Sequence, residues 1–246
     1  MPRTATHAPE VAPVLEAVGA MAASAFQVTE QITARTTSLL EDVPEPRRAL
    51  LSELDDLVVA LVEQPDEPVQ GAGFVAAVGL LADAPWWLEW FLLGDDQRAR
   101  RLVSQSDPEG VGFYDYEHFP WYVVPRDTGR RHVTGPYVDY LCTDDYTLTF
   151  TVAVRLGGRF AGVAGADIGV ETAERLLLPS LRASGRRLAV VNAQGRIVSS
   201  NSGRHLCGDL VEELDVPAAW AARTRPAGLH VVDDLPLAVL ELDRIG

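Results

Sequence analysis

The segment YTLTFTVAVRLGGRFAGVAGADI, residues 146–168, constrains the fold more than any other part of the chain. β-branched residues recur in alternation on both sides of Gly157 and Gly158, and two glycines between such runs are typical of a tight β-turn. A hairpin of two antiparallel strands is therefore predicted, with Asp167 at its end. The segment VETAERLLLPSLRAS follows and predicts a helix. We expect the apolar stripe of this helix to contain Leu176, Leu177 and Leu181.

Two helices are predicted before the hairpin. Apolar residues recur every three or four positions from Pro9 to Glu41 and again from Arg47 to Glu63, with two prolines in the break between them. The short apolar runs GFVAAVGLLA and WWLEWFLL fit buried strands, and residues 130–140 read as extended.

The last sixty residues begin a second set of elements. RLAVVNAQGRIVSSN predicts two short strands about a turn at residues 193–195, and LHVVDDLPLAVLELD predicts another hairpin. Between them we expect a helix from Asp209 to Leu214. The order predicts an α+β fold: a helical stalk over residues 1–66, a first module over 67–180 and a smaller second module over 181–246.

Charge and hydropathy exclude several classes of function. A net charge of −14 disfavours binding to nucleic acids and to anionic membrane surfaces. The N-terminus lacks the pattern of a signal peptide, and the longest uncharged run, Pro68 to Ala82, is shorter than the roughly 20 residues of a spanning helix. Cys142 and Cys207 are isolated, which suits a reducing compartment. We therefore expect a cytoplasmic protein.

Signals for catalysis are few. The sequence has no HExxH, GxSxG or GxxxxGK[ST] motif, and GAGFVAAVG lacks the spacing of a dinucleotide fingerprint. His205 and Cys207 offer two metal ligands where about four are normally needed. We expect no enzyme activity, no metal and no cofactor. The acidic pairs at 144–145 and 233–234 read as turn residues.

The stretch FYDYEHFPWY, residues 113–122, is the candidate wall of a binding site. Aspartates beside aromatic rings suit a protonated amine, because carboxylates accept charge-assisted hydrogen bonds and each ring adds roughly 0.5–2 kcal/mol of cation–π attraction. The alternative is that the rings are core and that the aspartates cap turns or the following helix. We assign Phe113 to the core. The residues expected to face the amine are Tyr114, Trp121, Tyr122, Tyr137, Asp139 and Asp167.

The motifs YDYEHFPWY, GPYVDY and GVAGAD, in this order, resemble the ligand-binding module of double Cache sensors, a PAS-like family of bacterial sensory domains. The resemblance spans about residues 110–178. It implies two tandem PAS-like modules with antiparallel sheets behind the N-terminal helix. Most members of the family are flanked by membrane spans. Because no span is predicted in this sequence, the chain resembles a soluble, stand-alone version.

The resemblance also implies roles for the site residues. In amino-acid-binding members, the positions of Tyr114, Trp121, Tyr122, Tyr137, Asp139 and Asp167 contact the ligand, and the acids and rings receive its amino group. The arginine that holds the ligand carboxylate corresponds to Phe119 here, and phenylalanine has no donors. We therefore predict a primary amine or polyamine-like ligand. The alternative is an amino acid whose carboxylate is held by Arg126, Arg130 or Arg131.

Further hypotheses concern the signalling output of the protein and its functional class. A sensor of this kind signals through a partner, which the sequence does not name, and the N-terminal helix is the expected place for a homodimer. That helix could instead pack only on its own domain. An enzyme using an aspartate as a base and an empty scaffold filled by Phe119 are the competing classes.

Overall fold

The structure is a computed structural model that describes residues 9–138, 146–232 and 234–244. The chain divides into two compact units. One comprises Ala23–Thr134 and Val138–Gly169 and is called here the six-stranded unit. The other comprises Met1–Ala22, Gly135–Tyr137 and Val170–Gly246 and is called the four-stranded unit. The division into residues 1–66, 67–180 and 181–246 stays a prediction.

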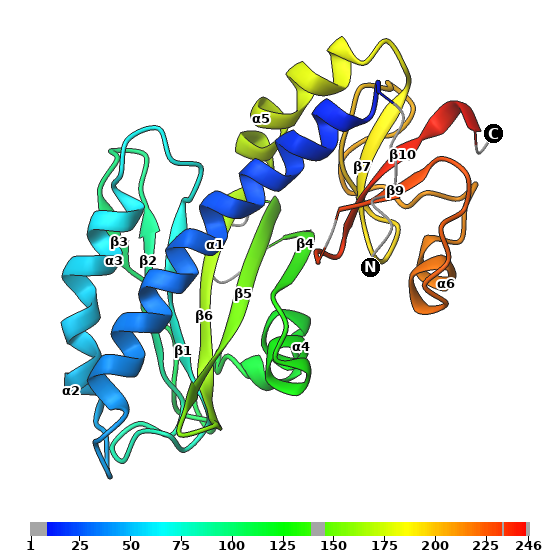
Figure 1. Cartoon of the computed structure of the whole chain (residues 1–246). Helices are drawn as coiled ribbons and strands as arrows, with labels where there is room; N and C mark the ends of the chain where they lie inside the picture. Colours follow the sequence, from blue (N-terminus) through cyan, green and yellow to red (C-terminus); the bar gives the residue numbers. More distant parts are fainter. Residues whose placement is uncertain (1–8, 139–145, 233, 245–246) are drawn as a thin grey trace. The chain divides into compact units, whose positions relative to one another are not determined.

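The predicted N-terminal helices are present. Helix α1 runs over Ala12–Leu40, and α2 (Arg48–Leu51), a 3-10 turn (Ser52–Leu54) and α3 (Asp55–Val62) follow the proline break. Within the six-stranded unit, α1 crosses one face of the sheet (Figure 1), where the Phe26 ring meets the Phe150 ring edge-on at 5.5 Å between centroids. The apolar stripe read from the sequence is therefore the buried side of α1.

The six-stranded sheet has the order β3-β2-β1-β6-β5-β4. The pairs β1–β2, β1–β6, β2–β3 and β5–β6 are antiparallel. The predicted hairpin is confirmed. Gly157 and Gly158 in its turn have φ values of +54° and +81°, which residues other than glycine rarely adopt. The strands are β1 (Gly71–Ala76), β2 (Leu88–Leu93), β3 (Ala99–Arg101), β4 (His132–Val138), β5 (Tyr146–Leu156) and β6 (Arg159–Gly169).

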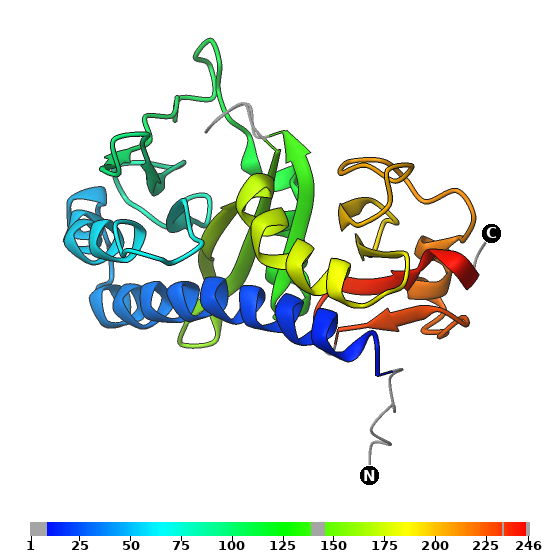
Figure 2. The ribbon, with the colours of Figure 1, turned by 90° about the horizontal axis from the view of Figure 1, so that it is seen from above.

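The segment between β3 and β4 lies on the side of the sheet away from α1, as Figure 2 shows. It contains a 3-10 turn (Tyr116–His118) and helix α4 (Pro120–Thr128). Pro120 suits the first turn of α4, since proline has no N–H to leave unpaired, and Gly129 ends the helix with φ +66°. The FYDYEHFPWY stretch is thereby placed over the sheet face opposite α1.

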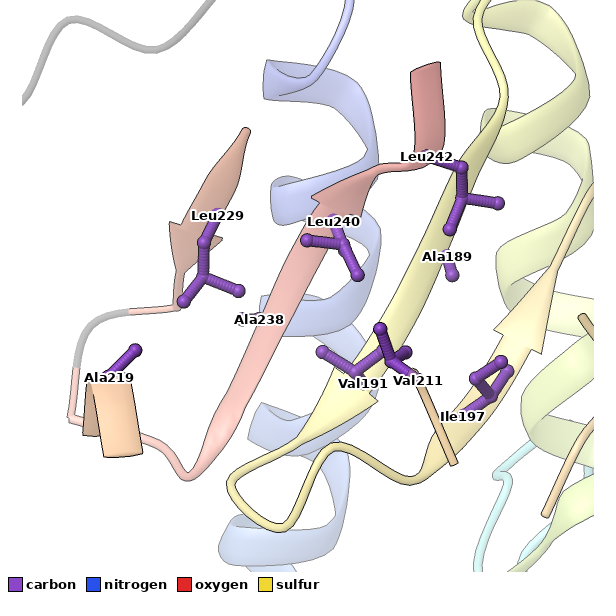
Figure 3. Close-up of a cluster of buried hydrophobic side chains, with 9 residues drawn as sticks. All are labelled: Ala189, Val191, Ile197, Val211, Ala219, Leu229, Ala238, Leu240 and Leu242. Atoms are coloured by element: carbon purple, nitrogen blue, oxygen red, sulfur yellow. The ribbon is translucent and has the colours of Figure 1, made fainter. Parts of the chain in front are cut away.

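The four-stranded unit contains α5 (Val170–Ala183) and an antiparallel sheet of order β8-β7-β10-β9. Nine buried apolar residues on the sheet and its connections form a core (Figure 3). Both predicted strand pairs of this unit are confirmed. The remaining elements are β7 (Leu188–Asn192), β8 (Ile197–Ser200), α6 (Val216–Ala221), β9 (Leu229–Val231), β10 (Leu237–Glu241) and a 3-10 turn (Leu242–Arg244).

Two local predictions are wrong. The residues from Asp209 to Leu214 are not helical, because the backbone there bonds to the β7–β8 turn: the Val211 N–H donates to the Gly195 carbonyl at 2.9 Å. The helix begins instead at Val216, where the Asp215 carboxylate caps it by accepting from the Ala218 N–H at 2.9 Å.

In α5, Leu177 and Leu181 are buried as predicted, but Leu176 is 41% exposed. The buried stripe is made by Val170, Ala173, Leu177 and Leu181, which follow the helical period. Leu176 precedes Leu177 directly, and neighbouring helical residues point about 100° apart.

Candidate functional site

Four of the predicted ring residues lie together. The Phe119 ring is stacked between the rings of Tyr114 and Trp121, with centroid distances of 5.3 Å and 6.0 Å and interplanar angles of 22° and 6°. Trp121 in turn meets Tyr122 edge-on at 6.0 Å. Phe119 is 39% exposed, so it belongs to a wall rather than to the core.

Tyr116 anchors this wall to the sheet. The ring is fully buried, its hydroxyl donates to the Ala76 carbonyl at 2.8 Å, and it accepts from the Trp87 N–H at 3.3 Å. The assignment of Phe113 to the core is wrong, because Phe113 is only half-buried and Tyr116 fills that place. A buried tyrosine needs partners for its hydroxyl, and these are Ala76 at the end of β1 and Trp87 directly before β2.

The two buried phenols stay protonated at neutral pH. Burial raises the pKa of Tyr122 to about 12 and raises the pKa of Tyr116 further. Their hydroxyl groups are therefore neutral and can both donate and accept hydrogen bonds.

Asp167 lies in β6 on the face opposite α1 and is only 5% exposed. In the sheet it stands between Thr149 of β5 and Gly71 of β1. The Thr149 hydroxyl donates to Asp167 Oδ1 at 2.6 Å. A methyl carbon added at Gly71 would lie 3.2 Å from Oδ2, so this second oxygen borders the space above Gly71. The carboxylate is thus held in a fixed position on the sheet.

Trp90 is a site residue that the sequence analysis missed. On the face that carries Asp167, one row of directly opposed residues contains Trp90, Gly73, Gly165 and Thr151. The two glycines leave room for the indole on the sheet. The alternation Gly71-x-Gly73 and Gly165-x-Asp167 puts side-chain-free positions on one face of two strands and could have signalled a floor for a large ring.

Seven side-chain polar atoms of the six-stranded unit are buried without a hydrogen-bond partner among the residues that the structure describes, and three of them belong to the ring wall or to the sheet face that carries Asp167. These three are the indole nitrogens of Trp90 and Trp121 and the hydroxyl of Thr151. Most buried polar groups in folded proteins have a partner, so these three donors are available to hydrogen-bond another molecule.

The remaining predicted site residues are Tyr137 and Asp139. Tyr137 is half-buried in β4. Asp139 lies outside the described residues, as do the acidic pair at 144–145 and Cys142.

Two of the three arginines considered as carboxylate-binding substitutes for Phe119 have other side-chain contacts. Arg131 pairs with Glu30 and lies over the Phe26 ring, both on α1. Arg126 pairs with Asp127 at 2.8 Å, and its guanidinium carbon lies 5.8 Å from the centre of the Tyr122 ring. Arg130 is exposed. Arg131 therefore points to the α1 side, away from Asp167.

Among the residues that the structure describes, no group of three or more His, Cys, Asp or Glu side chains is placed to hold a metal ion. His205 contacts Ser202 at 3.2 Å and Glu213 at 3.4 Å, and burial raises the pKa of the Cys207 thiol to about 11.

Among the described helices none is both long enough and apolar enough to cross a membrane.

Solved structures share the fold of this chain. A methyl-accepting chemotaxis protein matches with a TM-score of 0.60 and 16% identity, over 94% of this chain and 91% of its own. The ligand-binding domain of a Campylobacter jejuni chemoreceptor in complex with L-valine matches with a TM-score of 0.58 and 12% identity, over 96% and 91%. This chain has the double Cache fold.

A third double Cache structure is the ligand-binding domain of a Pseudomonas aeruginosa amino-acid chemoreceptor in complex with GABA. It matches with a TM-score of 0.51 and 20% identity, over 92% of this chain and 91% of its own. No protein-family model matches the sequence, and no curated protein matches it. The predicted α+β class, with a long N-terminal helix and two antiparallel sheets, is confirmed.

Proposed function

We propose that the chain is a small-molecule sensor domain that binds a cationic amine over the six-stranded sheet and signals through a partner. The observation that carries the proposal is Asp167, a carboxylate that is buried on the sheet face opposite α1 and oriented by Thr149. A buried carboxylate attracts an ammonium group strongly, because little water competes for it.

The ring wall of Tyr114, Phe119 and Trp121 supports the same ligand class. Phe119 uses both of its faces in the stack, so cation–π attraction to the ligand comes from the outer faces of Tyr114 and Trp121. In this proposal the ammonium group lies between the wall and Asp167, with Tyr122 completing the amine-holding set.

The structural neighbours favour a ligand with an amino group. The neighbours described above were solved with GABA and with L-valine, and another, from Pseudomonas fluorescens, with L-alanine. An amino acid with a relocated carboxylate site is therefore the second candidate. The specific observation in its favour is the buried indole N–H of Trp121, which can donate to a carboxylate oxygen.

Binding accounts for this site better than catalysis does. An ammonium group beside Asp167 would keep the carboxylate ionised and occupied, which is unsuited to abstracting a proton. The signalling partner, a homodimer through the N-terminal helix and the cytoplasmic location belong to the proposal as well.

The proposal is tested by isothermal titration of the chain with propylamine, putrescine, ethanolamine and L-alanine, compared with Asp167→Asn. We expect at least one of the amines to bind and its affinity to fall by at least tenfold in Asp167→Asn, because the substitution keeps the shape of the side chain and removes its charge. Glu67→Gln removes the same charge from an exposed turn of the same unit and should leave binding unchanged. Equal affinity in both variants would contradict the proposal.

A further inference from the structure

Trp90 lies flat on the floor of the proposed site. Its side chain is 5% exposed and covers two glycines of neighbouring strands. A methyl carbon added at Gly165 would lie 2.7 Å from Trp90 Cη2, and one added at Gly73 would lie 2.9 Å from Trp90 Cε3. The six-membered ring therefore occupies the places where the side chains of residues 73 and 165 would be.

The N–H edge of the indole borders the same space as Asp167. A methyl carbon added at Gly71 would lie 3.3 Å from Trp90 Nε1 and 3.2 Å from Asp167 Oδ2. The same methyl carbon would lie 2.8 Å from Leu92 Cδ2, so a donor, a carboxylate oxygen and one apolar side chain flank the small volume above Gly71. Within residues 9–138, 146–232 and 234–244, nothing accepts a hydrogen bond from this buried N–H.

We propose that Trp90 binds the ligand directly and selects amines that carry an oxygen two carbons from the nitrogen. The inference rests on the proposed function, because Asp167 must hold the ammonium group. An ammonium group has only donors and cannot satisfy the Trp90 N–H. A hydroxyl or carboxylate oxygen can accept from it, and its bonded chain places the ammonium group beside Asp167.

The N–C–C–O unit is shared by amino alcohols and α-amino acids, so two probe sets separate these sources. Ethanolamine is compared with propylamine, and L-alaninol with sec-butylamine, since each pair differs by a hydroxyl in place of a methyl group. L-Alanine carries the carboxylate form of the same unit. Titrations are made with the wild-type chain, Trp90→Phe and Trp220→Phe, the last being a tryptophan of the four-stranded unit.

The wild type should bind the oxygen-bearing member of each pair about tenfold more tightly, which is the effect of one well-placed neutral hydrogen bond. Trp90→Phe keeps an aromatic ring and loses the donor, so this preference should fall to about one. Trp220→Phe should keep the preference. If the affinity for L-alanine falls in Trp90→Phe, the Trp90 N–H donates to a carboxylate oxygen as well as to a hydroxyl oxygen.

Two results would overturn the inference. Equal affinities of the wild type for ethanolamine and propylamine would refute the role of Trp90 and leave the amine site standing. Binding of neither probe set would refute the proposed function and this inference together.

A second measurement uses the wild-type chain and therefore tests the inference even if Trp90→Phe does not fold. The chain contains five tryptophans, so ¹⁵N-tryptophan labelling yields five indole N–H signals. The assigned Trp90 signal should shift on saturation with ethanolamine and stay in place with propylamine. A Trp90 signal that ethanolamine leaves in place would also overturn the inference.

Discussion

Gly165→Ala tests the floor of the site without a ligand. The added methyl carbon would lie 2.7 Å from Trp90 Cη2, 3.1 Å from Trp90 Cζ3 and 3.2 Å from Thr151 Cγ2, so the indole must move by more than a small adjustment. Gly165 lacks a positive φ, so alanine can adopt its backbone conformation. The effect therefore reports side-chain crowding, chiefly by the indole and to a smaller extent by Thr151.

The expected loss of stability follows from two opposing effects. Overpacking a dense core costs about 1–3 kcal/mol, whereas replacing glycine stabilises by about 0.4–1 kcal/mol because the unfolded chain loses freedom. We expect a net loss of about 1–2 kcal/mol in the free energy of unfolding. Gly203→Ala, where the added methyl group meets nothing within 4 Å, should be neutral or slightly stabilising.

Urea unfolding of a double-mutant cycle isolates the contact. Leucine at position 90 is too short to cover Gly165, so Gly165→Ala should cost much less in a Trp90→Leu background, giving a coupling of at least about 1 kcal/mol. Additivity of the two substitutions to within about 0.5 kcal/mol would refute the placement of the indole.

Three further outcomes are expected. Tyr116→Phe should lower the free energy of unfolding by about 2 kcal/mol in a urea titration, because it removes the partner of the Ala76 carbonyl and of the Trp87 N–H. Tyr146→Phe, at a half-exposed position, should change it by less than about 0.5 kcal/mol in the same titration. Burial lowers the pKa of His132 from 6.5 to about 4, so the unfolded chain takes up a proton that the folded chain excludes. The free energy of unfolding should therefore fall by about 3 kcal/mol as the pH drops from about 7 to 4, and His132→Phe should flatten that dependence. Phe119→Arg should raise the affinity for L-alanine by about tenfold or more in calorimetry, and an unchanged affinity would argue against a carboxylate near this wall.

Helices and strands could be predicted where the sequence pattern that encodes them is local. The β5–β6 hairpin is encoded by alternation and by two glycines in its turn, and Asp167 follows from the same strand. The glycines of β1 and β6 indicate a bare sheet face, but the sequence does not predict that Trp90 covers it, because Trp90 meets Gly165 only after β2, β1 and β6 pair. Pairing between strands so distant in sequence leaves no local pattern.

The errors have equally specific causes. The residues from Asp209 to Leu214 have apolar spacing compatible with a helix, yet their backbone bonds to the turn before β8. Among adjacent rings in FYDYEHFPWY, composition does not tell which one is buried. That choice depends on hydrogen-bond partners for the Tyr116 hydroxyl, which are the Ala76 carbonyl and the Trp87 N–H.

The order of strands in the four-stranded unit has a consequence for how the protein is made. β10 lies between β7 and β9, so the strand synthesised last in this sheet occupies its centre. A nascent chain that ends before Leu237 has β7 and β8 but lacks the strand to which both β7 and β9 bond. Because domains fold as units during synthesis, the six-stranded unit can form while translation continues. The four-stranded unit must wait until residue 241 has been added, and a nonsense mutation near the end of the described chain removes its middle strand and leaves two unpaired edges.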